Sequence, residues 1–129
     1  MVDIPGRRVS HGDSFFSDWF SRGGDSMIVR AETIIDSGLD VDIEVETRKE
    51  PGTAASTLTP TYVSNGTGTK LRLNDPGVFT GLWRASTTGG AVDSLQGQVR
   101  LKVSTNGGVA NNYQVIRVFP PVFFDNAKP

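Results

Sequence analysis

Three groups of residues in the sequence have side chains and spacing that could do chemistry. The first is His11, the single histidine of the chain, with Asp13 and Ser14 close behind it, which together supply the residue types of a Ser-His-Asp triad. A triad needs a scaffold that fixes its members in space, and neighbours in a terminal segment seldom meet that need. We therefore interpret His11 as an ordinary exposed or interface histidine and predict that the protein is not an enzyme.

The second group is a row of four carboxylates that alternate with apolar residues. Its members are Asp40, Asp42, Glu44 and Glu46. On a strand they share one face at about 6–7 Å from one to the next, a distance that suits glycosidase chemistry or, with oxygen ligands, calcium. A row on a flat face does not converge on one point. We favour a solvated face balanced by basic side chains of a neighbouring strand, such as Arg30, Arg100 or Lys102.

The third group is Trp83 with Arg84, a pair that could form part of a sugar-binding platform. A tryptophan inside a strand-like segment is more often buried in the core of a sandwich. Glycine pairs, among them Gly23-Gly24 and Gly107-Gly108, lack the spacing of phosphate-binding loops, so we interpret them as turns.

Composition narrows the class of protein. The 129 residues have the size of one domain, and the lack of cysteine excludes disulfides, Fe–S clusters and thiol nucleophiles. The net charge of −1 gives no global field for nucleic acid or for a membrane surface. No apolar run has the length of a membrane span, and residues 1–12 lack the apolar stretch of a signal peptide. We predict a cytoplasmically made protein that binds no nucleic acid, membrane, metal or cofactor.

The elements that must position these groups are strands. Residues 39–48 alternate strictly between apolar and polar side chains, which predicts a strand with one buried and one wet face. Ser26–Asp36 is a second strand, and the turn residues between the two predict a hairpin. Further strands are expected at 61–64, 70–73, 78–86, 95–104 and 113–119. The pattern predicts an all-β fold, an antiparallel β-sandwich of the jelly-roll kind.

Aromatic residues gather near the two ends of the chain. Six of the eleven aromatics lie outside the predicted strands, namely Phe15, Phe16, Trp19, Phe20, Phe123 and Phe124. Terminal segments are usually polar unless something holds them, so these rings either close the core or bind a neighbouring subunit. We expect an N-terminal arm at 1–25, a sandwich at 26–119 and a C-terminal tail at 120–129, with one amphipathic turn at 14–20.

Two stretches of the chain resemble virion proteins of tailed bacteriophages. One is FSRGGDSMIVRAETIIDSGLDVDIEVETRKE, residues 20–50, an apolar–acidic segment that ends in a short polar run. The other is YQVIRVFPPVFFDNAKP, residues 113–129, in which a strand meets two prolines and an aromatic tail. Together they cover about a third of the chain and are similar in pattern to small β-sandwich head proteins that decorate or cement the capsid shell.

The resemblance implies a structural virion protein on the capsid surface that binds and stabilises the shell of the major capsid protein. It implies a homo-oligomer, a dimer or a trimer, and no catalytic residues. The six aromatic residues near the ends are then the expected partner-binding residues. The alternative, from a different class, is a carbohydrate-binding sandwich module of a fibre or a secreted assembly.

Overall fold

Two antiparallel sheets pack face to face in the computed structural model, which describes residues 3–84 and 95–125. Sheet A contains β1 (Ile4–Ser10), β11 (Tyr113–Val118), β4 (Ser26–Asp36), β9 (Gly77–Arg84), β7 (Tyr62–Val63) and β12 (Val122–Phe124). Sheet B contains β2 (Ser14–Phe16), β3 (Phe20–Ser21), β10 (Gln98–Asn106), β5 (Asp40–Arg48), β6 (Ser56–Thr57) and β8 (Leu71–Leu73). The described residues contain no helix, which confirms the all-β sandwich.

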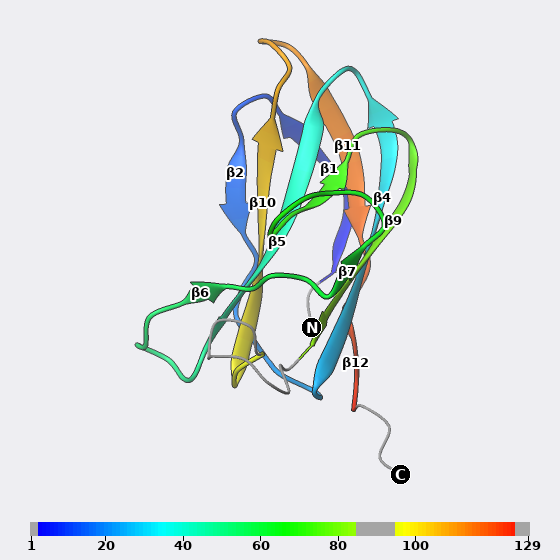
Figure 1. Ribbon diagram of the computed structural model, residues 1–129. Helices are drawn as coiled ribbons and strands as arrows, with labels where there is room; N and C mark the ends of the chain where they lie inside the picture. Colours follow the sequence, from blue (N-terminus) through cyan, green and yellow to red (C-terminus); the bar gives the residue numbers. More distant parts are fainter. Residues whose placement is uncertain (1–2, 85–94, 126–129) are drawn as a thin grey trace.

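The strand order is that of a jelly roll. Strand β1 pairs with β11, β2 and β3 pair with β10, β4 pairs with β9, and β5 pairs with β8. Each pair is nested inside the previous one along the chain, and successive pairs fall in alternate sheets. Figure 1 shows the result from the side, with β2, β10 and β5 on the left and β11, β4 and β9 on the right.

The apolar layer between the sheets follows from the period of two in the long strands. In β5, Val41, Ile43 and Val45 are fully buried, whereas the acidic residues between them point to the outer face. Burying one such aliphatic side chain contributes about 1.5–3 kcal/mol. The same alternation in the neighbouring strand and in the facing sheet supplies Val99, Leu101 and Val103 from β10 and Met27, Val29 and Ala31 from β4.

A buried polar contact ties the two sheets together. Gln114 of β11 donates from Nε2 to the carbonyl oxygens of Leu39 and Leu73, the second at 2.7 Å. Its Oε1 accepts a hydrogen bond of 3.2 Å from the hydroxyl of Thr33. Because Leu73 belongs to sheet B, this fully buried glutamine fixes the spacing of the two layers as well as satisfying its own polar atoms.

The expected arm and tail are strands of the sandwich. Of residues 1–25, β1 pairs with β11 at an edge of sheet A, while β2 and β3 pair with β10 at an edge of sheet B. The amphipathic turn expected at 14–20 is therefore wrong. Beyond Pro120-Pro121, β12 pairs with β4, so the described part of the tail completes sheet A. Apart from β1, these strands have only two or three residues, so they are recognised from their pairing partners, which a local pattern does not reveal.

The hairpin expected between Ser26–Asp36 and the acidic strand does not form. Strand β4 lies between β11 and β9, and β5 lies beside β10, so the turn after Asp36 carries the chain from sheet A to sheet B. The Asp36 carboxylate accepts hydrogen bonds from the backbone N–H groups of Gly38 and Leu39, at 2.8 and 3.0 Å. The sequence therefore predicted correctly that a turn follows Asp36. It predicted wrongly that the turn joins two neighbouring strands of one sheet.

Replacing Gln114 with Leu should lower the free energy of unfolding by about 3 kcal/mol, because two buried carbonyls and one hydroxyl lose their partner. Denaturant unfolding followed by tryptophan fluorescence measures this loss. Gln96→Leu, at a half-exposed glutamine of the chain, is the control and should change the value by about 0.5 kcal/mol or less. A loss at Gln114 no larger than at Gln96 contradicts the structural role of the buried amide.

Candidate functional site

The six aromatic residues singled out near the ends of the chain divide into two sets. Phe15, Phe20 and Phe123 are half-buried and pack against the core between the sheets. The rings of Phe20 and Phe123 meet edge to face with their centroids 6.1 Å apart, which joins the first strands of the chain to the last. For these three rings, closing the protein's own core is the role that the packing shows.

The other three rings, Phe16, Trp19 and Phe124, are turned towards the surface. Phe16 and Phe124 are 47% and 36% exposed. Trp19 is half-buried, and the guanidinium carbons of Arg48 and Arg100 lie 4.1 and 4.5 Å from its ring centroid. These residues remain available for contact with another molecule.

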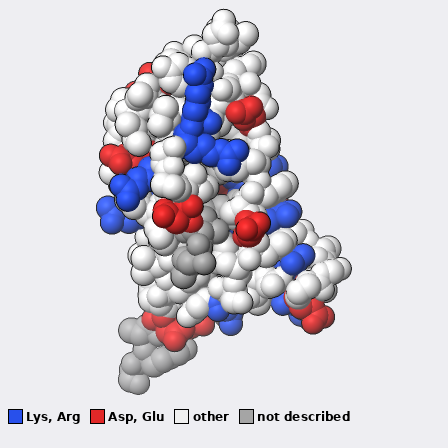
Figure 2. Space-filling model, turned by 180° about the vertical axis from the view of Figure 1, so that it is seen from behind, with Lys and Arg blue, Asp and Glu red and all other residues white. Residues whose placement is uncertain are grey.

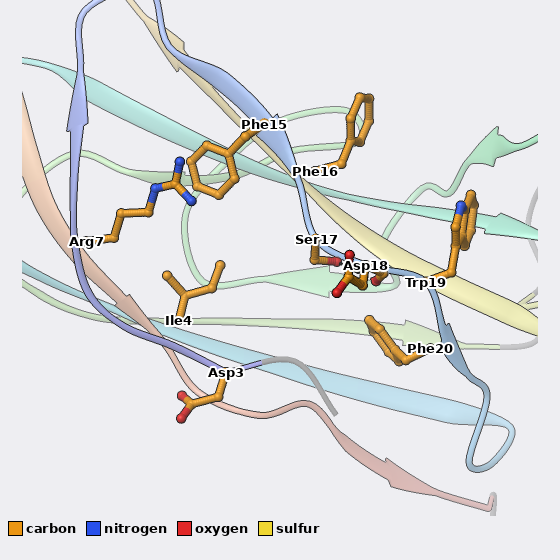
Figure 3. A pocket seen from close by; sticks show the side chains of 9 residues that line it. All are labelled: Asp3, Ile4, Arg7, Phe15, Phe16, Ser17, Asp18, Trp19 and Phe20. Carbon is orange, nitrogen blue, oxygen red and sulfur yellow. Dashed lines mark hydrogen bonds between the residues drawn. The ribbon is translucent and has the colours of Figure 1, made fainter.

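A pocket of about 480 Å³ opens beside these rings, between the edge strand of sheet A and the edge strand of sheet B. It is lined by Asp3, Ile4 and Arg7 on one side and by residues 15–20 on the other. Figure 3 shows Ile4 and Arg7 facing Phe15 across this space, whereas the rings of Phe16 and Trp19 point to the far side of their strand.

The pocket combines an apolar floor with charged groups that lack counter-ions. The Arg7 guanidinium carbon lies 3.6 Å from the centroid of the Phe15 ring. All ion pairs found in the described residues involve Asp42 or Glu46, so Arg7, Asp3 and Asp18 have none. Such a site suits a ligand with an apolar body and polar ends, and it contains no base aligned with a nucleophile.

Sequence reasoning missed Asp3, Ile4, Arg7 and Asp18 as possible binding residues. These residues lie close together because the jelly-roll order places β1 and β2 at the same side of the sandwich but in different sheets. Local patterning marks strands and turns, whereas this neighbourhood arises because the two N-terminal strands, β1 and β2, pair with β11 and β10. The clustered aromatics from Phe15 onward were the only available signal.

The acidic row is paired far more than a solvated face would be. Asp42 is 1% exposed and receives two hydrogen bonds from Arg72, at 2.8 and 3.2 Å. Glu46 accepts two from Arg100, which confirms one of the expected basic partners. Arg30, another expected partner, lies in sheet A and faces away from this row. Two members of the row, Asp42 and Glu46, thus form cross-strand ion pairs with Arg72 of β8 and Arg100 of β10.

The negative charge of Asp40, at the end of this row, is less fully balanced by basic side chains. Partial burial raises the pKa of its carboxyl above the ordinary 3.8, Arg72 opposes that rise, and the carboxylates of Asp36, Asp42 and Asp75 add to it. The same Asp42 carboxylate raises the pKa of Arg72 through their hydrogen bond. The charged form of Asp40 is therefore disfavoured in the folded protein relative to the unfolded chain.

Trp83 and His11 are the remaining candidates from the sequence, and the structure places neither in the pocket. Trp83 is fully buried in the core, so it cannot act as an exposed sugar platform, and its Nε1 has no hydrogen-bond partner among the described residues. His11 is exposed in the turn between β1 and β2. The Asp13 carboxylate accepts a hydrogen bond of 2.9 Å from the backbone N–H of Ser10, so it stabilises the turn rather than orienting the histidine.

Within the described ranges 3–84 and 95–125, no cluster of three or more His, Asp or Glu side chains could hold a metal ion. The same part of the chain has no helix that is long and apolar enough to cross a membrane. Comparison of the sequence and structure with protein-family models, curated proteins and solved structures gave no match.

Asp42→Ser should lower the free energy of unfolding by about 2 kcal/mol, because Arg72 loses the carboxylate it binds while remaining partly hydrated. Glu32→Ser, a mid-strand carboxylate in sheet A, is the matched control and should change it by about 0.5 kcal/mol or less. Chemical denaturation of both variants measures the difference. Equal small effects would show that Asp42 behaves as a solvated surface residue.

Asp40→Asn should raise the melting temperature at pH 7. A folded-state pKa above the unfolded one means that ionised Asp40 opposes folding, and this opposition vanishes as the pH falls below the ordinary value of 3.8. The melting curves of the variant and the parent should thus converge in acid. A variant that is less stable than the parent at pH 7 contradicts the assignment.

Proposed function

We propose that the protein is a structural decoration (cement) protein of a tailed bacteriophage, located on the capsid surface and bound to the major capsid protein. The observation on which the proposal rests most is the pocket between β1 and β2, bordered by the exposed Phe16 and the half-buried Trp19. It lies at the edge of the sandwich and offers contact chemistry, without a catalytic arrangement among the described residues that line it. The jelly-roll fold, which recurs in viral capsid domains, adds support by analogy alone.

The pocket has the features of a site for a protein anchor. A few buried anchors supply most of the energy of a protein interface, and aromatic or arginine side chains around a pocket commonly form such centres. Ile4, Phe15 and Phe20 give an apolar floor that an inserted side chain can cover. Arg7 on one wall and Asp18 on the other provide unpaired charges for polar groups of the partner's backbone or side chains.

The aromatic faces favour protein over carbohydrate. A sugar ring usually stacks on an open aromatic face, but guanidinium groups already lie over the rings of Phe15, Phe16 and Trp19. Guanidinium groups held in this way keep their N–H edges free to bind carboxylates or carbonyls. We therefore propose the decoration role as the function and keep carbohydrate binding as an outcome that the experiment detects.

Phe16→Ala and Trp19→Ala should each weaken binding to phage particles by about tenfold or more, since loss of an interface anchor costs above 1 kcal/mol. Co-sedimentation of the purified protein with particles of the phage whose genome carries the gene measures the affinity. Val109→Ala removes a 67% exposed apolar side chain in the loop between β10 and β11 and serves as the matched control.

Sedimentation of the free protein tests the proposed dimer or trimer in the same preparation. Binding that is unchanged in both aromatic variants would remove the rings of Phe16 and Trp19 beside the pocket as the anchor. A wild-type protein that does not bind the particles, or a glycan-array signal that is lost in Trp19→Ala, would overturn the decoration role.

A further inference from the structure

The two sheets carry different balances of charge. The strands of sheet B hold four acidic and four basic residues, and all the ion pairs found in the described residues involve carboxylates of this sheet. The strands of sheet A hold five arginines against Glu32 and Asp36. Asp36 is engaged in its own turn, so Glu32 is the one strand carboxylate of sheet A that remains for these arginines. Sheet A therefore has an excess of unpaired positive charge.

Three of these arginines lie over aromatic rings on the outer face of sheet A. The Arg8 guanidinium carbon lies 4.2 Å from the centroid of Tyr113. Arg30 and Arg117 approach the ring of Phe119, at 5.7 and 4.5 Å. Stacking restricts the long side chains while leaving their N–H groups free, which lowers the entropy lost when a carboxylate is bound.

An exposed apolar row crosses the same face beside the arginines. The strand register aligns Tyr62 with Leu82, Leu82 with Ile28, and Ile28 with Val122, so the row spans β7, β9, β4 and β12. Its outer members, Tyr62 and Val122, are 56% and 57% exposed, and the two central ones are half-buried. Arg30 lies two residues from Ile28 on the same face of β4, next to this row.

We propose that the outer face of sheet A docks an acidic protein surface whose carboxylates lie beside apolar side chains. The charge is complementary because Arg8, Arg30 and Arg117 lack ion pairs in the described residues, and the row from Tyr62 to Val122 supplies the apolar contact. This inference relies on the proposed function solely for the identity of the partner, a component of the capsid shell. The surface is distinct from the pocket, because none of its residues, Arg8 of β1 included, lines the pocket.

A protein fits this face better than nucleic acid does. Contact with phosphates makes no use of a wide apolar row, and Glu32, directly opposite Arg117 in the register, would repel a phosphate backbone. On the face that Figure 2 shows, basic and acidic side chains of the described residues are interspersed.

Arg30→Glu and Arg117→Glu should each weaken binding to the phage particles by at least about tenfold at low salt, because each replaces attraction with repulsion. Both arginines are exposed, so the domain should keep its melting temperature. Lys49→Glu, an exposed cation in the loop after β5 with the same change of charge, is the matched control. Wild-type binding should weaken as salt rises, and Arg117→Glu should reduce that dependence.

Photo-crosslinking from p-benzoylphenylalanine placed at position 62 then identifies the occupant on the particle. The expected product is a shell-protein segment that contains aspartate or glutamate together with apolar residues. A crosslink to nucleic acid, a segment without acidic residues, or an Arg117→Glu affinity equal to that of Lys49→Glu would overturn the inference.

If the wild-type protein does not bind the particles, the proposed function fails, and the surface is tested with poly-L-glutamate as the probe. Amide resonances of β4, β9 and β11 should then shift in a titration followed by NMR, and Arg117→Glu should abolish the shifts. No shift in these strands would reject the docking surface itself.

Discussion

The apolar layer between the two sheets is the interaction on which the rest of the structure depends. Strands β4, β5, β10 and β11 each give every second side chain to this layer, so the residues between them must face outwards. Shifting the register of any of these strands by one residue would bury its charged face. The hydrogen bonds of Gln114 add a directional constraint within the same layer, since they join β11 to the carbonyl groups of the facing side.

The alternation of core-facing and outward-facing residues determines which face of each sheet carries the charged side chains. The carboxylates of β5 must share one outer face, and there Arg72 and Arg100 neutralise Asp42 and Glu46 through hydrogen-bonded pairs. Residues of sheet A alternate between the core and the outer face in the same way. Few of those on the outer face are acidic, and the arginines there lie over aromatic rings. The outer face of sheet B thus carries the ion pairs of the described residues, whereas the arginines on the outer face of sheet A are unpaired there.

Much of the fold could be predicted from the sequence because its long strands have strong local patterns. The strict alternation that ends at Arg48 gave β5, and the turn residues after Asp36 marked the end of β4. The pairing of these two strands was predicted wrongly, because a turn sequence fixes a reversal of the chain and not the sheet that receives it. Burial of Trp83 in the core was anticipated correctly from its place in a strand-like segment.

The candidate site was much less accessible to sequence reasoning. Phe15 and Phe16 are adjacent in the chain, yet one packs on the core and the other is exposed, because β2 alternates against β10. Assigning them to a terminal arm concealed that alternation. The pocket additionally requires Ile4 and Arg7 from the other sheet, a contact between layers that no local period encodes.

We propose that one sandwich bridges neighbouring molecules through two separate surfaces, the pocket beside β1 and β2 and the outer face of sheet A. A protein that cements a shell must contact at least two neighbours at once. A single sandwich with two separate binding surfaces meets that need. Hydrogen–deuterium exchange of the free and particle-bound protein tests this most directly. The account predicts two distinct regions of added protection, one around residues 14–20 beside the pocket and one in β4, β7, β9, β11 and β12. Protection confined to a single region, or unchanged exchange on binding, would contradict it.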